Sequence, residues 1–199
     1  MRKTWIFSLA AGAGFLLACN LCGFGELIER LRKTLEEKGG ITTAETGREP
    51  DFEGFGFSLV LPDGWEIIGS QPPGSLPGME ITWARLAHEE GLEAGVTCII
   101  DPKRFEGKSA EEVARYMVRE LGVDLPPAID EGWITVSGVK GYEATYVMEE
   151  GSFAFRYIAL ATEDQSRIFT VEFSRYGENG FTSADKREMK RFLEGIRID

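Results

Sequence analysis

The sequence predicts an α+β fold: an α/β/α sandwich in which helices flank a central, mainly antiparallel sheet of six to eight strands. Three observations indicate this. Short polar turns separate most of the predicted strands between residues 79 and 175, so neighbouring strands run antiparallel. One strand, residues 152–162, is apolar on both sides, as expected for a strand covered from both directions. Two amphipathic helical segments, 109–121 and 183–196, supply the covering layers.

The predicted domain, residues 51–199, opens with a hairpin. Apolar residues alternate over 57–61, and Pro62-Asp63-Gly64 favours a turn. The return strand starts at Trp65, which we expect to be buried under a helix. The next stretch, 69–78, contains three prolines and predicts a loop rather than a regular strand.

A second hairpin and a helix follow. Strands 79–87 and 93–101 are joined by the turn 88–92. Ser109, with Glu112 three residues later, forms a capping box at the start of the helix, and Gly122 ends it.

The remaining elements are a meander and a closing helix. Its strands are predicted at 133–137, 139–148, 152–162 and 167–175. The last of these places Thr170, Glu172 and Ser174 on a side that we expect to face solvent. Thr182 or Ser183 caps the closing helix.

The N-terminus indicates export. Residues 1–18 read as a signal peptide, because two basic residues precede an apolar run too short to span a bilayer. The run ends in Leu16-Leu17-Ala18-Cys19, which resembles the lipobox of bacterial lipoprotein precursors. The resemblance implies that Cys19 carries the lipid and anchors the chain in the bacterial cell envelope. In a host with two membranes, Asn20 after the lipidated cysteine resembles a sorting signal for the outer membrane, with the domain facing the periplasm. The alternative is an ordinary secretory signal with Cys19 incidental.

Residues 19–50 are expected to form the tether. A short helix at 26–38 carries an apolar stripe of Leu27, Ile28, Leu31 and Leu35. The stripe leaves three positions open: on the domain, at the membrane surface or on a partner. The sequence does not decide the state of the two other cysteines: Cys22 and Cys98 are either free or joined in a disulfide.

The order of these elements resembles the Mog1/PsbP-like fold, which includes PsbP, Mog1 and bacterial lipoproteins akin to DcrB. The likeness covers 51–199 and rests on three stretches: Phe57-x-x-x-Leu61-Pro62-x-Gly64-Trp65, the helix from Ser109, and Phe192-x-x-x-Ile196-x-Ile198. Members are mostly non-enzymatic binding or assembly factors, and the resemblance implies the same here.

The composition and the motifs favour binding over catalysis. A net charge of -11 disfavours nucleic acid as a partner. The one histidine, His88, has no recognisable nucleophile near it in sequence and is expected to be an exposed turn residue. We therefore expect no enzymatic activity, no catalytic or metal-binding residues and no cofactor. The leading hypothesis is a lipid-anchored envelope protein that binds or stabilises another envelope protein or complex.

Two alternatives remain. One is a carrier of a small apolar ligand, with a pocket built from five aromatic residues: Trp65, Trp83, Trp133, Phe52 and Phe55. The other is a metal-dependent hydrolase whose ligands come from acidic turns. The candidate carboxylates are Glu89, Glu90, Glu93, Asp124, Asp130 and Glu131.

Overall fold

The computed structural model describes residues 52, 54–76, 79–101, 105–121, 125–148, 153–164, 166–177 and 180–199. Within these residues, seven strands form one antiparallel sheet in the order β2-β3-β4-β8-β7-β6-β5. The strands are β2 (Trp65–Leu76), β3 (Met79–His88), β4 (Leu92–Ile100), β5 (Asp130–Val136), β6 (Val139–Val147), β7 (Phe153–Ala161) and β8 (Arg167–Tyr176). The predicted fold class and the predicted antiparallel sheet are confirmed.

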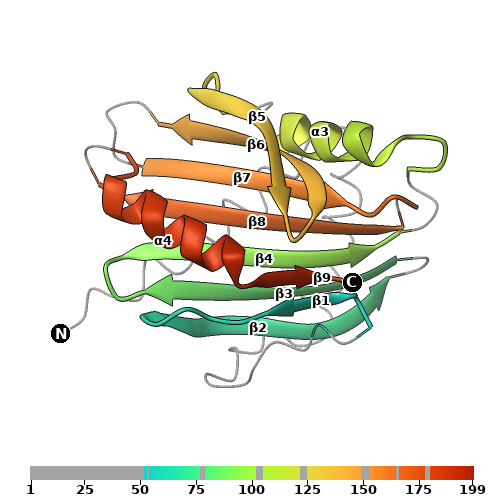
Figure 1. Ribbon diagram of the computed structural model, residues 1–199, viewed down its shortest axis with the longest axis horizontal. Helices are drawn as coiled ribbons and strands as arrows, with labels where there is room; N and C mark the ends of the chain where they lie inside the picture. The colour runs from blue at the N-terminus through green and yellow to red at the C-terminus, as the bar shows by residue number, and fades with distance from the viewer. Residues whose placement is uncertain are drawn as a thin grey trace.

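A helix lies on each side of this sheet (Figure 1). Helix α3 (Ala110–Leu121) connects β4 to β5 and packs over β6 and β7. Helix α4 (Ser183–Glu194) follows β8 and packs on the opposite face. We call these sides the α3 face and the α4 face. Neither helix has the length and apolarity of a membrane span.

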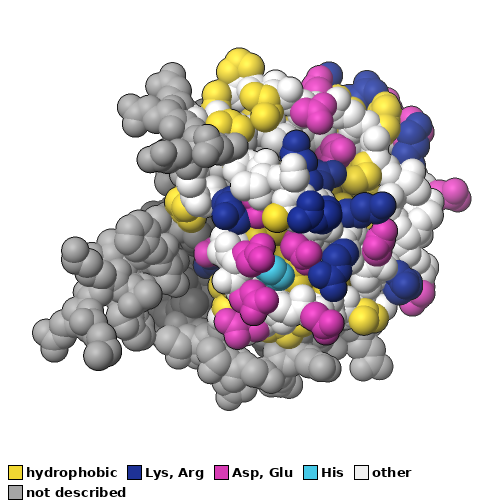
Figure 2. Space-filling model, turned by 60° about the vertical axis from the view of Figure 1, so that its left-hand side comes forward, with side chains coloured by type: hydrophobic (Ala, Val, Ile, Leu, Met, Phe, Trp, Pro, Cys, Tyr) yellow, Lys and Arg dark blue, Asp and Glu magenta, His cyan; other side chains and the backbone are white. Residues whose placement is uncertain are grey.

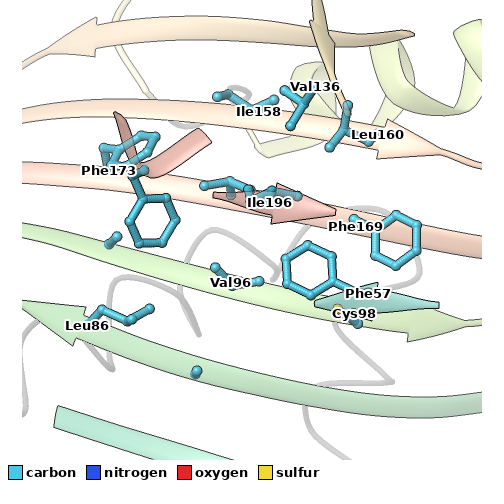
Figure 3. Close-up of a cluster of buried hydrophobic side chains, with 14 of the residues drawn as sticks. Phe57, Leu86, Val96, Cys98, Val136, Ile158, Leu160, Phe169, Phe173 and Ile196 are labelled. Atoms are coloured by element: carbon cyan, nitrogen blue, oxygen red, sulfur yellow. The ribbon is translucent and has the colours of Figure 1, made fainter. Parts of the chain in front are cut away.

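The larger core lies on the α4 face. It joins side chains of the sheet to α4 and to a small two-stranded sheet formed by β1 (Phe57–Leu59) and β9 (Ile196–Ile198). Figure 3 shows Phe57 and Ile196 of the small sheet among Phe169, Phe173 and Cys98 of the large one. Each Å² of apolar surface that these side chains remove from water stabilises the fold by about 25 cal/mol.

The smaller core lies on the α3 face. Val113 and Met117 of α3 pack there with Tyr157 and Ala159 of β7. The opposite side of β7 contributes Ile158 to the α4-face core, and its exposed fraction is zero. The prediction that this strand is covered from both directions is therefore confirmed.

The predicted opening hairpin is wrong in its pairing. The turn exists, because the Trp65 amide donates to the Pro62 carbonyl over 3.3 Å. However, β1 pairs with β9 at the other end of the chain, in the register Phe57↔Ile198 and Leu59↔Ile196. β2 pairs instead with β3. The chain between them crosses from the small sheet to the edge of the large one.

The loop predicted at 69–78 is also wrong over most of its length, because β2 continues to Leu76. Its pairing with β3 shifts register between Gln71 and Gly74, so Pro72 and Pro73 stand opposite a single residue of β3. β2 is the outermost strand on its side. An edge position and a bulge are the places where a strand tolerates proline.

Both helices begin as predicted. At α3, the Glu112 amide donates to the Ser109 hydroxyl over 3.2 Å, and the Ser109 amide donates to the Glu112 carboxylate over 2.7 Å. At α4, Thr182 forms the equivalent capping box with Asp185. The predicted C-terminal residue of α3, Gly122, lies outside the described residues.

Candidate functional site

The predicted lipid-attachment residue, Cys19, lies outside the described residues, as do the signal peptide, the tether with its helix at 26–38, and Cys22. Cys98 is described. It is a free thiol in the α4-face core with an exposed fraction of zero, as expected for a small buried hydrophobe. Burial raises the pKa of this thiol far above its ordinary value, so Cys98 is unsuited to act as a nucleophile.

His88 is not the exposed turn residue that the sequence predicts. Only 8% of it is exposed, because its ring lies 5.3 Å from the ring of Trp65 and under α4. Gly64 packs against the same ring, and a Cβ at Gly64 would come within 2.7 Å of His88 Nε2. Figure 2 shows the single histidine of the chain set among acidic and basic side chains.

Both ring nitrogens of His88 face a protein group. The Glu90 amide donates to Nδ1 over 3.2 Å, so Nδ1 carries no proton and Nε2 carries it. Nε2 faces Glu188 of α4 at 3.7 Å. A general base needs a free lone pair within reach of a substrate proton. His88 instead links the β3–β4 turn to α4.

The acidic candidates that the structure describes do not come together. Glu89 and Glu90 are exposed in the turn, whereas Glu93 points to the α3 face and pairs with Arg85 over 2.9 Å. Asp130 and Glu131 are consecutive in β5, and their side chains therefore point to opposite faces. Asp124 lies outside the described residues. Within the described part of the chain, no group of three or more His, Cys, Asp or Glu residues could hold a metal ion.

The aromatic residues proposed for a ligand pocket are also dispersed. Phe52, Phe55 and Trp65 are buried in the α4-face core. Trp83 lies on the α3 face. It pairs with Thr97, which pairs with Thr170, which in turn pairs with Ala159 of the α3-face core, and paired residues point to the same side of a sheet. Trp133 of β5 is also on the α3 face and is 39% exposed. The structure therefore does not gather the three tryptophans around one cavity.

Trp133 belongs to an exposed surface on the outermost strand, β5. The Arg115 guanidinium lies 4.9 Å from its ring centroid, the Lys140 ammonium lies 4.6 Å from it, and the Tyr142 ring meets it edge-on at 4.9 Å. Ile129, just before β5, is 66% exposed. We call Arg115, Ile129, Trp133 and Lys140 the β5 surface. Its tryptophan is held in place before any partner arrives, which lowers the entropic cost of binding.

A second cluster lies at the centre of the α3 face, on β3, β4 and β8. We call it the Glu172 patch, and it consists of Trp83, Arg85, Glu93, Thr97, Thr170 and Glu172. Thr97 and Thr170 stand directly opposite each other, with exposed fractions of 4% and 2%. The Thr170 hydroxyl is buried without a hydrogen-bond partner among the described residues.

Glu172 lies beside these threonines. Its carboxyl group extends over Gly95, where a Cβ would lie 3.6 Å from Glu172 Cδ, and Arg85 stands on the other side of Gly95. Burial raises the pKa of Glu172 from 4.5 to about 7, although the Arg85 charge lowers it. The patch therefore combines a carboxyl group, a guanidinium group and a buried free hydroxyl.

Sequence reasoning missed both surfaces. The pattern of β8 predicted a solvent-facing side for Thr170, Glu172 and Ser174, yet Thr170 is buried and the other two are half-buried. A signal for the β5 surface was present, since the predicted strand carries Trp133 and the next strand carries Lys140 close to it in sequence. Nothing in the sequence predicted that Arg115 of α3 would lie beside the Trp133 ring.

Comparison with known proteins gives low similarities. No family model and no curated protein matches the chain. The crystal structure of LpqN, involved in cell envelope biogenesis of Mycobacterium tuberculosis, matches with a TM-score of 0.39 and 14% identity, over 77% of this chain and 86% of that one. A structure from Bacteroides thetaiotaomicron matches with a TM-score of 0.38 and 11% identity, over 76% of this chain and 48% of that one. This chain thus spans about half the length of the latter.

Proposed function

We propose that the protein is a lipid-anchored, non-catalytic component of the bacterial cell envelope that binds or stabilises another envelope protein through the β5 surface. Cys19 supplies the anchor, and the domain presents its binding residues to the surrounding compartment. The Mog1/PsbP-like relationship belongs to the same proposal and rests on the residues that resemble that fold.

The observation that carries the proposal is the exposed Trp133 between two cations. Tryptophan and arginine are the residues most enriched where interfaces concentrate their binding energy. Trp133 and Ile129 provide the apolar anchor. Arg115 provides positive charge beside it, whereas the Lys140 ammonium is already paired with the Glu111 carboxylate. The protein as a whole carries a net charge of -11, so this local positive charge favours a partner segment with an apolar side chain next to an acidic one.

A photoreactive residue at position 129 tests the proposal in cells that make the lipid-anchored chain. Ile129 is 66% exposed, so the substitution leaves the core intact. Irradiation is expected to give an adduct with one other envelope protein, identified by mass spectrometry. Trp133→Ala in the same chain should reduce the adduct at least tenfold, because a central interface tryptophan contributes on the order of 2 kcal/mol or more.

The matched control places the photoreactive residue at Lys186, an exposed position of α4 on the other face. No adduct from position 129, or the same adduct with equal yield from position 186, would contradict a role for the β5 surface.

The anchor has its own test. Cys19→Ala should leave the precursor uncleaved by the lipoprotein-specific peptidase, because the thiol must carry its diacylglyceryl group before the cut. The mutant should run as the longer precursor and should carry no lipid. Asn20→Ala, next to it, is the control and should be processed normally. Normal processing of the Cys19 mutant would remove the proposed lipid anchor.

A further inference from the structure

The two outermost strands of the described sheet differ in how their edges are built. β2 pairs with β3 through two register shifts, and Pro72 and Pro73 lie inside one of them. Bulges and prolines keep an edge strand from pairing with another chain. β5, the outermost strand on the other side, pairs with β6 in an unbroken register over all seven of its residues and contains no proline (Figure 1). Of the two strands, β5 therefore has the regular edge to which a further strand can add.

The register of the β5–β6 hairpin shows which backbone groups point outward. Ser137 and Gly138 form its two-residue turn, and both have a positive φ, 51° and 81°, as a type I′ turn requires. Val136 and Val139 flank this turn and exchange two hydrogen bonds, and such bonded pairs alternate with non-bonded pairs along an antiparallel ladder. The residues of β5 whose N–H and C=O groups point away from β6 are therefore Glu131, Trp133 and Thr135.

A hydrogen bond at the other end of the hairpin gives the same assignment. The Ile129 amide donates to the Thr145 carbonyl over 2.8 Å, so this carbonyl points toward β5. Thr145 pairs with Asp130, which makes this a hydrogen-bonded pair, and Trp133 is three residues further along β5. An odd separation turns the backbone groups of Trp133 to the outer edge. Trp133 is 39% exposed, and the two other residues with outward backbone groups are also exposed.

We propose that the partner of the β5 surface binds by adding an extended segment to the edge of β5 as a further strand of the sheet. The inference rests on the proposed function and deepens it, because it names the form that the partner takes at that surface. The outward N–H and C=O groups of β5 bind the main chain of the segment, which supplies affinity without regard to its sequence. An antiparallel segment is favoured, since antiparallel ladders are slightly more stable per residue.

Side chains on the two faces of β5 select the segment. In an antiparallel ladder, the partner residue opposite Trp133 lies about 5.5 Å away, from Cα to Cα, and points to the α3 face. An apolar residue there contacts the Trp133 ring, and an acidic residue two positions along reaches the Arg115 guanidinium, which lies 4.9 Å from that ring. The residue between them points to the α4 face, where half-buried Ile134 offers apolar contact. The segment that fits thus carries an apolar and an acidic residue on one face and an apolar residue between them.

The edge is held in shape before a partner arrives. At the tip of the hairpin, the Ile198 amide of β9 donates to the Ser137 hydroxyl over 3.0 Å. On the α3 face, Arg115 and Tyr142 contact the Trp133 ring. A strand fixed at its end and on one face loses little conformational freedom when it pairs, which lowers the entropic cost of adding a strand.

Proline substitutions at the outward amides test the proposal in the photocrosslinking experiment at position 129. Glu131→Pro and Thr135→Pro each remove one outward N–H group and leave the hydrogen bonds to β6 in place. Each should lower the yield of the adduct at least tenfold, because it removes a main-chain hydrogen bond and places a ring where the segment packs. Glu131→Ala and Thr135→Ala keep the N–H group and are the matched controls. Their yields should stay within twofold of that of the otherwise unsubstituted chain.

The outcomes separate this inference from the proposed function. No adduct from position 129 in the otherwise unsubstituted chain contradicts the proposed function and the inference that rests on it. An adduct that survives both proline substitutions shows a partner that contacts the β5 surface without strand pairing, which overturns the inference alone. Equal losses in the proline and alanine variants assign binding to the side chains and overturn it as well. An adduct between isotope-labelled and unlabelled copies of the chain assigns the edge to a second copy instead.

A second measurement does not depend on whether the proline variants fold. It is residue-resolved hydrogen exchange of the mature chain, kept in solution by Cys19→Ser. After correction for intrinsic rates, exchange should be at least tenfold faster at the amides of Glu131, Trp133 and Thr135 than at those of Gly132 and Ile134. The partner segment crosslinked at position 129, added as a synthetic peptide at saturating concentration, should slow exchange at the first three amides at least tenfold.

Two results of this measurement would overturn the proposal. Slow exchange at the three outward amides in the free chain would show that the edge of β5 is already paired. Unchanged exchange in the presence of the peptide would show that the segment binds without adding a strand.

Discussion

Trp65→Ala is expected to lower the free energy of unfolding by about 3–5 kcal/mol, the usual cost of removing a large aromatic side chain from a core. Trp65 is 8% exposed, and its ring centroid lies 4.8 Å from that of Phe192 in α4 and 5.3 Å from that of His88. Phe192 in turn meets Phe173 edge-on at 5.4 Å. The cavity would therefore open between α4 and the sheet. Chemical denaturation of the mature chain measures the effect.

Two other tryptophan variants act as controls. Trp65→Phe should cost only about 1 kcal/mol, because the ring remains and because the buried Trp65 Nε1 has no hydrogen-bond partner among the described residues to lose. Trp133→Ala removes the same side chain from a position that is 39% exposed and should cost about 1 kcal/mol or less. If Trp65→Ala lowers the free energy of unfolding by less than about 1 kcal/mol, the packing of α4 on the sheet does not depend on this residue.

The elements that the sequence predicts well are those whose signals are local. The apolar patterns of β6 to β8 and the capping residues Ser109 and Thr182 all depend on neighbours within a few positions. The pairing of β1 does not. Phe57 fits a hairpin with Trp65 equally well by pattern, but its ring stacks on Phe169 at 5.6 Å, and the last residues of the chain offer it a partner strand. Such non-local pairing leaves no mark in a single sequence.

The candidate surfaces show the same limit. The sequence shows that Thr170 and Glu172 lie on the same side of β8. It does not predict which residues pack against that side. Their neighbours on the adjacent strands, Thr97 and Tyr157, come from distant parts of the chain. His88 is a similar case, because a turn position predicts exposure, and only the approach of Glu188 and Trp65 buries the ring. The sequence thus predicts which residues share one side of a strand or turn, but not whether distant residues bury them.

Glu172→Gln should abolish a pH dependence of stability that the wild-type protein shows near neutrality. Burial raises the pKa of Glu172 from 4.5 to about 7 in the folded state. Between these values the folded protein keeps the proton and the unfolded chain releases it, so wild-type stability falls as the pH rises from about 5 to about 7.5. A shift of this size corresponds to at most about 3 kcal/mol, and the glutamine variant, which has no proton to lose, avoids the loss.

The measurement is the free energy of unfolding of both proteins at several pH values from about 4 to about 8. The two proteins should be close in stability at the acid end, and Glu172→Gln should be more stable by up to about 3 kcal/mol at the alkaline end. Glu66→Gln, at an exposed position of β2, is the control and should follow the wild-type curve. Parallel curves for wild type and Glu172→Gln would mean that water reaches this carboxylate freely and that burial does not raise its pKa in the folded state.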